Sequence, residues 1–146
     1  MTNYWLLKTE PGTYSYADLE RDGRTVWDGV TNALALKHLR LMKRGDLALI
    51  YHTGEEKQVV GITEVVSDPY PDPNEKNQKL VAVDLKPRER LERGVTLAEI
   101  KKRKEFAAPD ESGQVFELVR MGRLSVMPVS KARWQRICEM AQVAAQ

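Results

Sequence analysis

The chain has 146 residues, 42% of them hydrophobic and 30% charged, which is the composition of an ordinary globular protein rather than of a disordered chain. It contains no apolar run near the about 20 residues that cross a bilayer, no basic region of the kind that opens a secretory signal, and one cysteine, which excludes an internal disulfide and indicates a reducing, cytoplasmic setting. The formal net charge of +2 is far below that of proteins that coat nucleic acid through charge alone, so a nucleic-acid partner would have to be selected by a local pocket.

The first third of the chain predicts short strands that alternate with capped helices. Residues 4–8, YWLLK, are expected to form a strand, and Ser15 with Asp18 three residues later is typical of the start of a short helix that ends near Gly23. A brief strand is expected at 24–27. A helix is expected over 32–42, capped by Thr31 or Asn32, with an apolar side formed by Leu34, Ala35, Leu39 and Met42.

The rest of the chain contains the clearest strands. Residues 46–52 and 58–66 flank a short turn and predict an antiparallel hairpin, and Gly61 inside the second strand indicates a bulge or a close backbone approach. Thr96 followed by Glu99 is a capping-box pattern that opens a further helix. The other expected elements are a proline-rich loop at 67–78, a long strand at 80–86 that can run on through Pro87, a helix or strand at 115–120, a strand at 124–129 and a helix at 131–143 with Trp134, Ile137, Cys138 and Ala141 on one side.

These elements predict an α+β fold and one domain over residues 1–146. Five or six strands and four or five short helices, with a long hairpin and no series of βαβ units, favour a small, strongly curved mixed sheet or barrel with helices packed around it.

The sequence lacks the residues of several common active sites. Two histidines and one cysteine, far apart, cannot supply the four ligands of a closed zinc site, and no glycine-rich motif for a dinucleotide or a nucleoside triphosphate is present. We interpret Cys138 as a buried, inert thiol and His38 as a solvated or partly packed side chain. We therefore expect neither a metal nor a cofactor.

Polar and aromatic side chains gather where the expected strands and turns end, and such positions expose binding groups on a rigid scaffold. An aromatic face can stack on a flat heterocycle, while amides, hydroxyls and cations can read its edge. Plainer interpretations remain open, because a tryptophan often fills a core and a lysine near a glutamate often forms a surface ion pair. The candidates are Lys8, Thr9 and Glu10 after the first strand, Trp27 and Asn32 around the Asp28–Gly29 turn, Tyr51 and His52 at a strand end, Tyr70 between two prolines, and Arg120, Arg123 and Ser125 before the last strand.

Five segments in series resemble the EVE domain family: YWLLKTEPGTYSYADL, WDGVTNALA, GDLALIYHTG, VVGITEVVSDPYPD and FELVRMGRLSVMPVSKARW. The resemblance runs from Tyr4 to about Met140. It implies a PUA-like fold, related to the YTH, ASCH and PUA domains, in which a small curved sheet is flanked by helices. It also implies a non-catalytic aromatic pocket for a base of DNA or RNA, with modified cytosines as the expected ligands. By this resemblance the pocket takes Lys8, Thr9, Glu10, Trp27, Asn32, Tyr51, His52, Tyr70, Arg120 and Ser125.

The chain also departs from the family pattern at the expected edge of this pocket. Thr31 and Ala33 stand where many members carry an arginine and a large aromatic or polar residue, and Leu36 or Lys37 stands where a second arginine is common. The resemblance therefore implies a pocket edge without that cation and that aromatic ring.

Two other functions stay open at this point. Related ASCH domains include small amidohydrolases that act on modified cytidines with a lysine, a threonine and an acid, and Lys8, Thr9 and Glu10 are of these types, although strand alternation turns Thr9 away from the other two. The other possible function is that of an adaptor that binds other proteins. Residues 101–104, KKRK, could contact phosphates but are also typical of a solvated helix face. We expect a monomer that binds nucleic acid and neither a membrane nor a metal.

Overall fold

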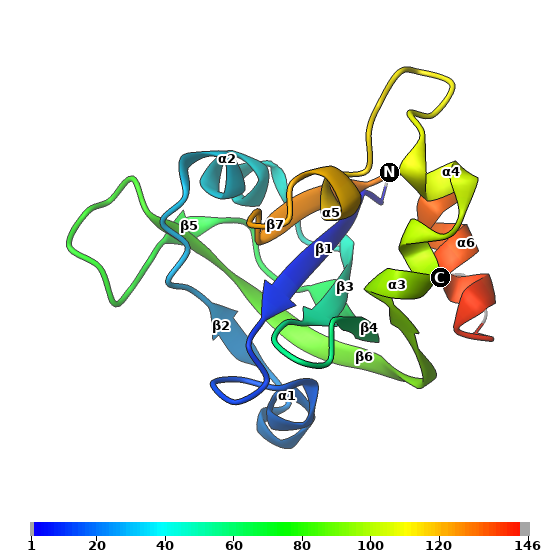
Figure 1. Cartoon of the computed structure of the whole chain (residues 1–146). Coiled ribbons are helices and arrows are strands. Elements are labelled where there is room, and N and C mark those ends of the chain that lie inside the picture. Colours follow the sequence, from blue (N-terminus) through cyan, green and yellow to red (C-terminus); the bar gives the residue numbers. More distant parts are fainter. Residues whose placement is uncertain (1, 144–146) are drawn as a thin grey trace.

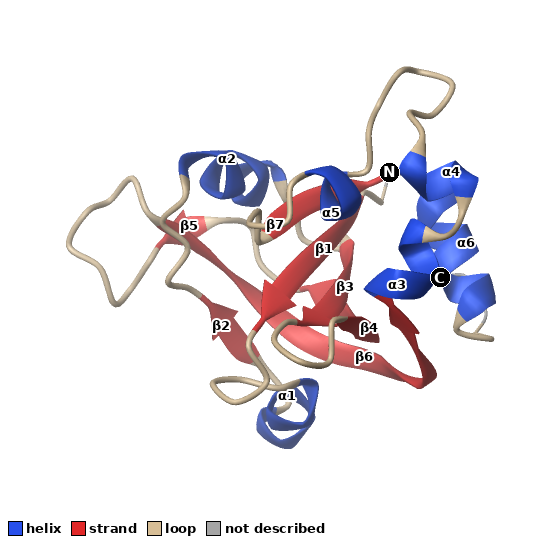
Figure 2. Ribbon diagram, viewed as in Figure 1, coloured by secondary structure: helices blue, strands red, loops and turns tan. Residues whose placement is uncertain are grey.

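The computed structural model describes residues 2–143, and its centre is a curled mixed sheet that forms a half-barrel (Figures 1 and 2). The strand order is β2-β6-β4-β3-β1-β7, and the two-residue β5 pairs with β6. The expected curved mixed sheet is thereby confirmed. The strands are β1 (Tyr4–Thr9), β2 (Thr25–Trp27), β3 (Leu47–His52), β4 (Gln58–Val65), β5 (Tyr70–Pro71), β6 (Val81–Thr96) and β7 (Val126–Val129).

Among the strands that the structure describes, one neighbouring pair is parallel. β1 runs parallel to β3, with Lys8 opposite Tyr51 and Thr9 opposite His52, whereas the other pairs are antiparallel. Parallel neighbours need a crossover connection. Here the crossover carries a helix, then β2, then a second helix, and it places β2 at one end of the sheet.

Six short helices surround the sheet within residues 2–143, and none of them has the length and apolar character needed to cross a membrane. The expected capping box of Thr96 and Glu99 is present, and the expected N-cap Ser15 forms a second one with Asp18. Asn32, and not Thr31, caps the helix that follows β2. The helices are α1 (Tyr16–Asp22), α2 (Ala33–Leu41), α3 (Leu97–Lys101), α4 (Lys104–Ala107), α5 (Glu117–Arg120) and α6 (Lys131–Met140).

Gly61 shows both features that its place in a strand predicts. In the β3–β4 pair Ile50 lies opposite Gly61 but Tyr51 lies opposite Val59, so the strand bulges between these two positions. A Cβ atom on Gly61 would lie 2.3 Å from Cε1 of Tyr16. The Tyr16 ring is buried against this backbone, and its hydroxyl donates a hydrogen bond to the carbonyl oxygen of Ile62 at 2.6 Å.

The structure changes several expected details. β6 does continue through Pro87 and reaches Thr96, and β5 forms inside the proline-rich loop. The predicted apolar side of α2 was partly wrong, because Leu36 is buried while Leu34 is only half-buried. This helix packs against both β6 and β7. The last helix ends at Met140 and not at residue 143, and residues 117–120 form α5 rather than a strand.

Candidate functional site

A cavity of about 1020 Å³ lies between the edge strand β2 and the C-terminal end of β1, and Thr13 and Tyr14 of the loop before α1 also line it. Figure 1 shows where these two strands lie in the sheet. Its volume is at the upper end of the range for sites that hold small molecules. The wall mixes two cations, Lys8 and Arg24, with aromatic, hydroxyl, amide and carboxylate groups. The structure brings six of the ten predicted site residues to this cavity: Lys8, Thr9, Glu10, Trp27, Asn32 and Ser125.

Trp27 is the aromatic wall of the cavity. Its indole is half-buried and packs against Tyr14 in an edge-to-face arrangement, with ring centroids 6.4 Å apart and an interplanar angle of 79°. The Tyr14 hydroxyl in turn donates to the carboxylate of Asp22 at 2.8 Å. These contacts hold the indole in place while part of its surface stays accessible.

The turn after Trp27 is held from outside by the segment that follows β5. The buried carboxylate of Asp72 accepts hydrogen bonds from the backbone N–H groups of Gly29 and Asn74, both at 2.9 Å. The side-chain amide of Asn74 donates to the carboxylate of Asp28 at 2.6 Å. Gly29 has a φ of +73°, a conformation that favours glycine. The direction in which the chain leaves Trp27 is therefore fixed.

Asn32 has a divided role. Its Oδ1 accepts a hydrogen bond from the N–H of Ala35 at 3.0 Å and caps α2. Asn32 is exposed, and because its side-chain oxygen is engaged by the cap, the Nδ2 group is the part of the side chain that can donate to a ligand.

Lys8 faces the cavity from β1, on the opposite wall. Its ammonium group donates to the carbonyl oxygen of Gly122 at 2.8 Å and lies 5.6 Å from the centroid of the Tyr51 ring. Burial lowers the pKa of the Lys8 ammonium below its ordinary value. The backbone N–H of Lys8 also donates to the carbonyl oxygen of Ser125 at 2.9 Å. Lys8 thus ties the segment before β7 to the rim of the cavity.

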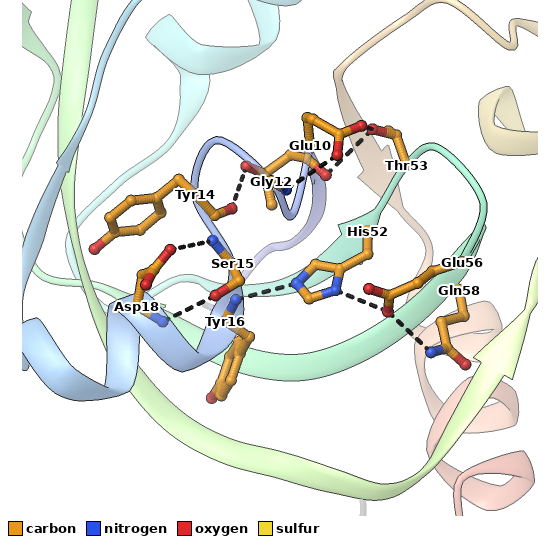
Figure 3. Close-up of polar contacts among 11 residues, drawn as sticks. Glu10, Gly12, Tyr14, Ser15, Tyr16, Asp18, His52, Thr53, Glu56 and Gln58 are labelled. Atoms are coloured by element: carbon orange, nitrogen blue, oxygen red, sulfur yellow. Dashed lines mark hydrogen bonds and ion pairs between the residues drawn. The ribbon is translucent and has the colours of Figure 1, made fainter.

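Thr9 and Glu10 shape the loop that leads into α1. The Thr9 hydroxyl donates to the carbonyl oxygen of Tyr14 at 2.7 Å. The Glu10 carboxylate accepts from the N–H of Gly12 at 3.0 Å and from the Thr53 hydroxyl at 3.4 Å (Figure 3). The side chains of these two residues and of Lys8 therefore form hydrogen bonds to different partners and not to one another.

Asp84 of β6 is a cavity residue that the sequence did not indicate. Its carboxylate accepts hydrogen bonds from the Tyr70 hydroxyl and, at 2.8 Å, from the Arg24 guanidinium. Burial alone would raise the pKa of Asp84, but these two donors outweigh it and hold that pKa below its ordinary value. Burial, reinforced by the bond to Asp84, raises the pKa of Tyr70 to about 12. The available signal was a single acid within the otherwise apolar run LVAVDL.

The other four predicted residues lie outside the cavity wall. Tyr51 and His52 are buried because β3 lies between β1 and β4. The Nε2 atom of His52 accepts the N–H of Tyr16 at 3.0 Å, so the ring proton is on Nδ1 and faces the Glu56 carboxylate at 3.0 Å (Figure 3).

Tyr70 and Arg120 lie outside the wall for different reasons. The Tyr70 hydroxyl is turned to Asp84, so Tyr70 reaches the cavity only through that carboxylate. Arg120 is the last residue of α5 and is exposed to solvent. Within residues 2–143, no group of three or more His, Cys, Asp or Glu side chains is placed to hold a metal ion.

The half-barrel with a cavity at its edge defines a PUA-like module. The EVE domain model matches residues 3–140, and the chain belongs to the EVE domain family. Rat thymocyte nuclear protein 1 is 29% identical over an alignment 172 positions long, which covers 97% of this chain and 75% of that protein.

Solved structures show the same relationship. A crystal structure of an Agrobacterium tumefaciens protein is 33% identical, with a TM-score of 0.90 and coverage of 99% of this chain and 97% of that one. The human THYN1 protein in complex with 5-methylcytosine-containing DNA is 27% identical, with a TM-score of 0.83 and coverage of 98% and 99%. An ASCH protein of Zymomonas mobilis, 12% identical with a TM-score of 0.56, shares the fold alone.

Proposed function

We propose that this chain binds one base of a nucleic-acid strand, a modified base of the cytosine type, in the cavity between β2 and β1, without reacting with it. The observation that carries the proposal is the half-exposed Trp27 indole beside the Asn32 amide in one cavity wall. An aromatic face for stacking and a fixed amide for the base edge are the groups that recognise an unstacked base. The DNA complex of the human relative supports the same class of ligand.

The charges around the cavity favour recognition of a base over general attraction to phosphates. Lys8 and Arg24 are matched by Glu10, Asp28 and Asp84 in the lining of the same cavity. A wall without an excess of positive charge adds little salt-dependent affinity. Selectivity then comes from stacking and hydrogen bonds, and an extruded or single-stranded base suits such a site because its unstacking cost is small.

A binding screen tests this function. Labelled single-stranded DNA and RNA oligonucleotides that carry one central cytosine, 5-methylcytosine or another modified cytosine would be titrated at one moderate salt concentration. Trp27→Ala should fold normally and weaken binding roughly 5- to 150-fold, since stacking contributes about 1–3 kcal/mol per base. Leu41→Ala, at an exposed side chain that does not line this cavity, is the matched control. Unchanged binding by Trp27→Ala, or its loss of fold, would show that the indole serves the core.

One observation favours a second function, hydrolysis of modified nucleosides in the manner of ASCH amidohydrolases. The lowered pKa of Lys8 is a property of lysines that act as bases. Against it, Lys8 donates to Gly122 and the Thr9 hydroxyl donates to Tyr14, so the two side chains are not aligned for proton transfer between them. Release of the acyl group from N4-acylated cytidine by the wild-type protein, and its loss in Lys8→Ala, would support the hydrolase.

A further inference from the structure

The free edge of β2 faces the cavity. β2 is the terminal strand of the sheet and pairs with β6 alone among the described strands. Thr25 lies opposite Leu85, Val26 opposite Asp84, and Trp27 opposite Val83. All three residues of β2 line the cavity, whose far wall is the end of β1. The backbone groups that β2 does not share with β6 therefore belong to the cavity wall.

The register identifies these groups. Opposite residues in an antiparallel pair alternate between exchanging two hydrogen bonds and exchanging none. The N–H of Asp84 donates to the Ser67 hydroxyl at 2.8 Å, and its carbonyl oxygen accepts from the N–H of Val66 at 2.9 Å, both on the side of β6 away from β2. Val26, opposite Asp84, therefore points its own N–H and C=O away from β6 and out of the sheet.

We propose that the main chain of Val26 reads the edge of the bound base, with its N–H donating to a ring nitrogen or carbonyl and its C=O accepting from the adjacent N–H. This inference rests on the proposed function and names a specificity-determining residue of the same site. A strand edge is a row of unsatisfied donors and acceptors that readily pairs with a matching partner. The neighbouring Trp27 indole supplies the stacking face, so one short strand provides both contacts.

The chemistry suits a cytosine-type base. Its N3 atom is an acceptor and its exocyclic N4 group is a donor, in the order that complements N–H and C=O of one extended residue. A substituent at C5 does not alter these two atoms, so the contact is the same for unmodified and 5-modified cytosine. The contact reads the paired acceptor and donor, and the C5 substituent is read by the rest of the cavity.

A proline substitution isolates the backbone donor. Proline is tolerated on an edge strand where the lost N–H faces away from the sheet. Val26→Pro should therefore fold, yet bind a single-stranded 5-methylcytosine oligonucleotide about tenfold more weakly, because one hydrogen bond is lost and its partner is left unsatisfied. Val26→Ala keeps the N–H and should therefore bind more tightly than Val26→Pro, whereas Leu41→Ala, at an exposed residue outside the cavity wall, should bind like the wild type. Thr25→Pro removes a bond to β6 and should melt at a lower temperature than Val26→Pro.

The wild-type protein supplies a second, independent measurement. Oligonucleotides with N3-methylcytosine, which lacks the acceptor, or N4,N4-dimethylcytosine, which lacks the donor, should bind at least about tenfold more weakly than the 5-methylcytosine strand. Equal binding of these analogues, or full binding by a folded Val26→Pro, would overturn the inference. If Trp27→Ala still weakens binding in that case, the proposed function stands without the main-chain contact. If the wild type binds none of the oligonucleotides, the proposed function itself fails.

Discussion

Gly61→Ala tests how tightly the start of α1 is packed against the bulge in β4. The added Cβ would lie 2.3 Å from Cε1 of Tyr16 and 2.5 Å from two further ring carbons, well inside van der Waals contact. The ring cannot swing away easily, since it is 1% exposed, its hydroxyl bonds to Ile62 and its backbone N–H bonds to His52. Overpacking of such a site costs about 3 kcal/mol, the upper part of the usual range.

For a chain of this size, that free energy corresponds to a fall of roughly 6–12 °C in the melting temperature. Circular dichroism melts and urea unfolding would measure it. Gly122→Ala is the control, because a Cβ there meets nothing within 4 Å and should change stability by less than about 0.5 kcal/mol. In a Tyr16→Leu background the penalty of Gly61→Ala should shrink. Equal melting temperatures for Gly61→Ala and Gly122→Ala would refute the packing argument.

Two further substitutions separate stability from binding. Asn32→Asp keeps a side-chain acceptor for the N–H of Ala35, so its melting temperature should stay near that of the wild type, whereas the loss of the Nδ2 donor should weaken oligonucleotide binding. Asn32→Ala loses both groups and should also lose about 1 kcal/mol of stability. Full binding by Asn32→Asp would contradict the divided role of this residue. Asp84→Asn should unfold at a lower urea concentration than the wild type at neutral pH. The pKa of Asp84 is lowered by Tyr70 and Arg24 in the folded state, so this stabilisation is present above the unfolded pKa and is lost as the pH falls through the folded one. The two urea midpoints should therefore converge in acid, and a constant gap would show that the carboxylate charge is not responsible.

The local patterns of the sequence predicted the scaffold well where they reflect backbone chemistry. The capping residues Ser15 and Thr96, the bulge at Gly61 and the buried side of α6 follow from rules that act over a few residues. Trp27 and Asn32 were predicted to lie in one site because they stand on either side of the Asp28–Gly29 turn, and the structure places both in the wall of one cavity.

The rest depended on contacts between distant segments. Tyr51 ends a strand, but β3 is central in the sheet, so the ring is covered by Lys8 rather than facing the cavity. Asp84 bonds to Tyr70 and to Arg24, and the three residues come from three separate segments. Their spacing in the sequence does not predict that they are in contact. Position within the sheet decides which strand ends are open.

The parallel pairing of β1 with β3 has a consequence for how such a protein can diversify. The crossover between these strands contains α1, β2 and α2. This single continuous segment of the chain therefore supplies nearly all of the cavity wall opposite β1. Substitutions, insertions or deletions within that crossover change the surface of the cavity, while the pairing of β1 with β3 stays the same. New ligand preferences can therefore arise without a change in how the hydrophobic core is packed.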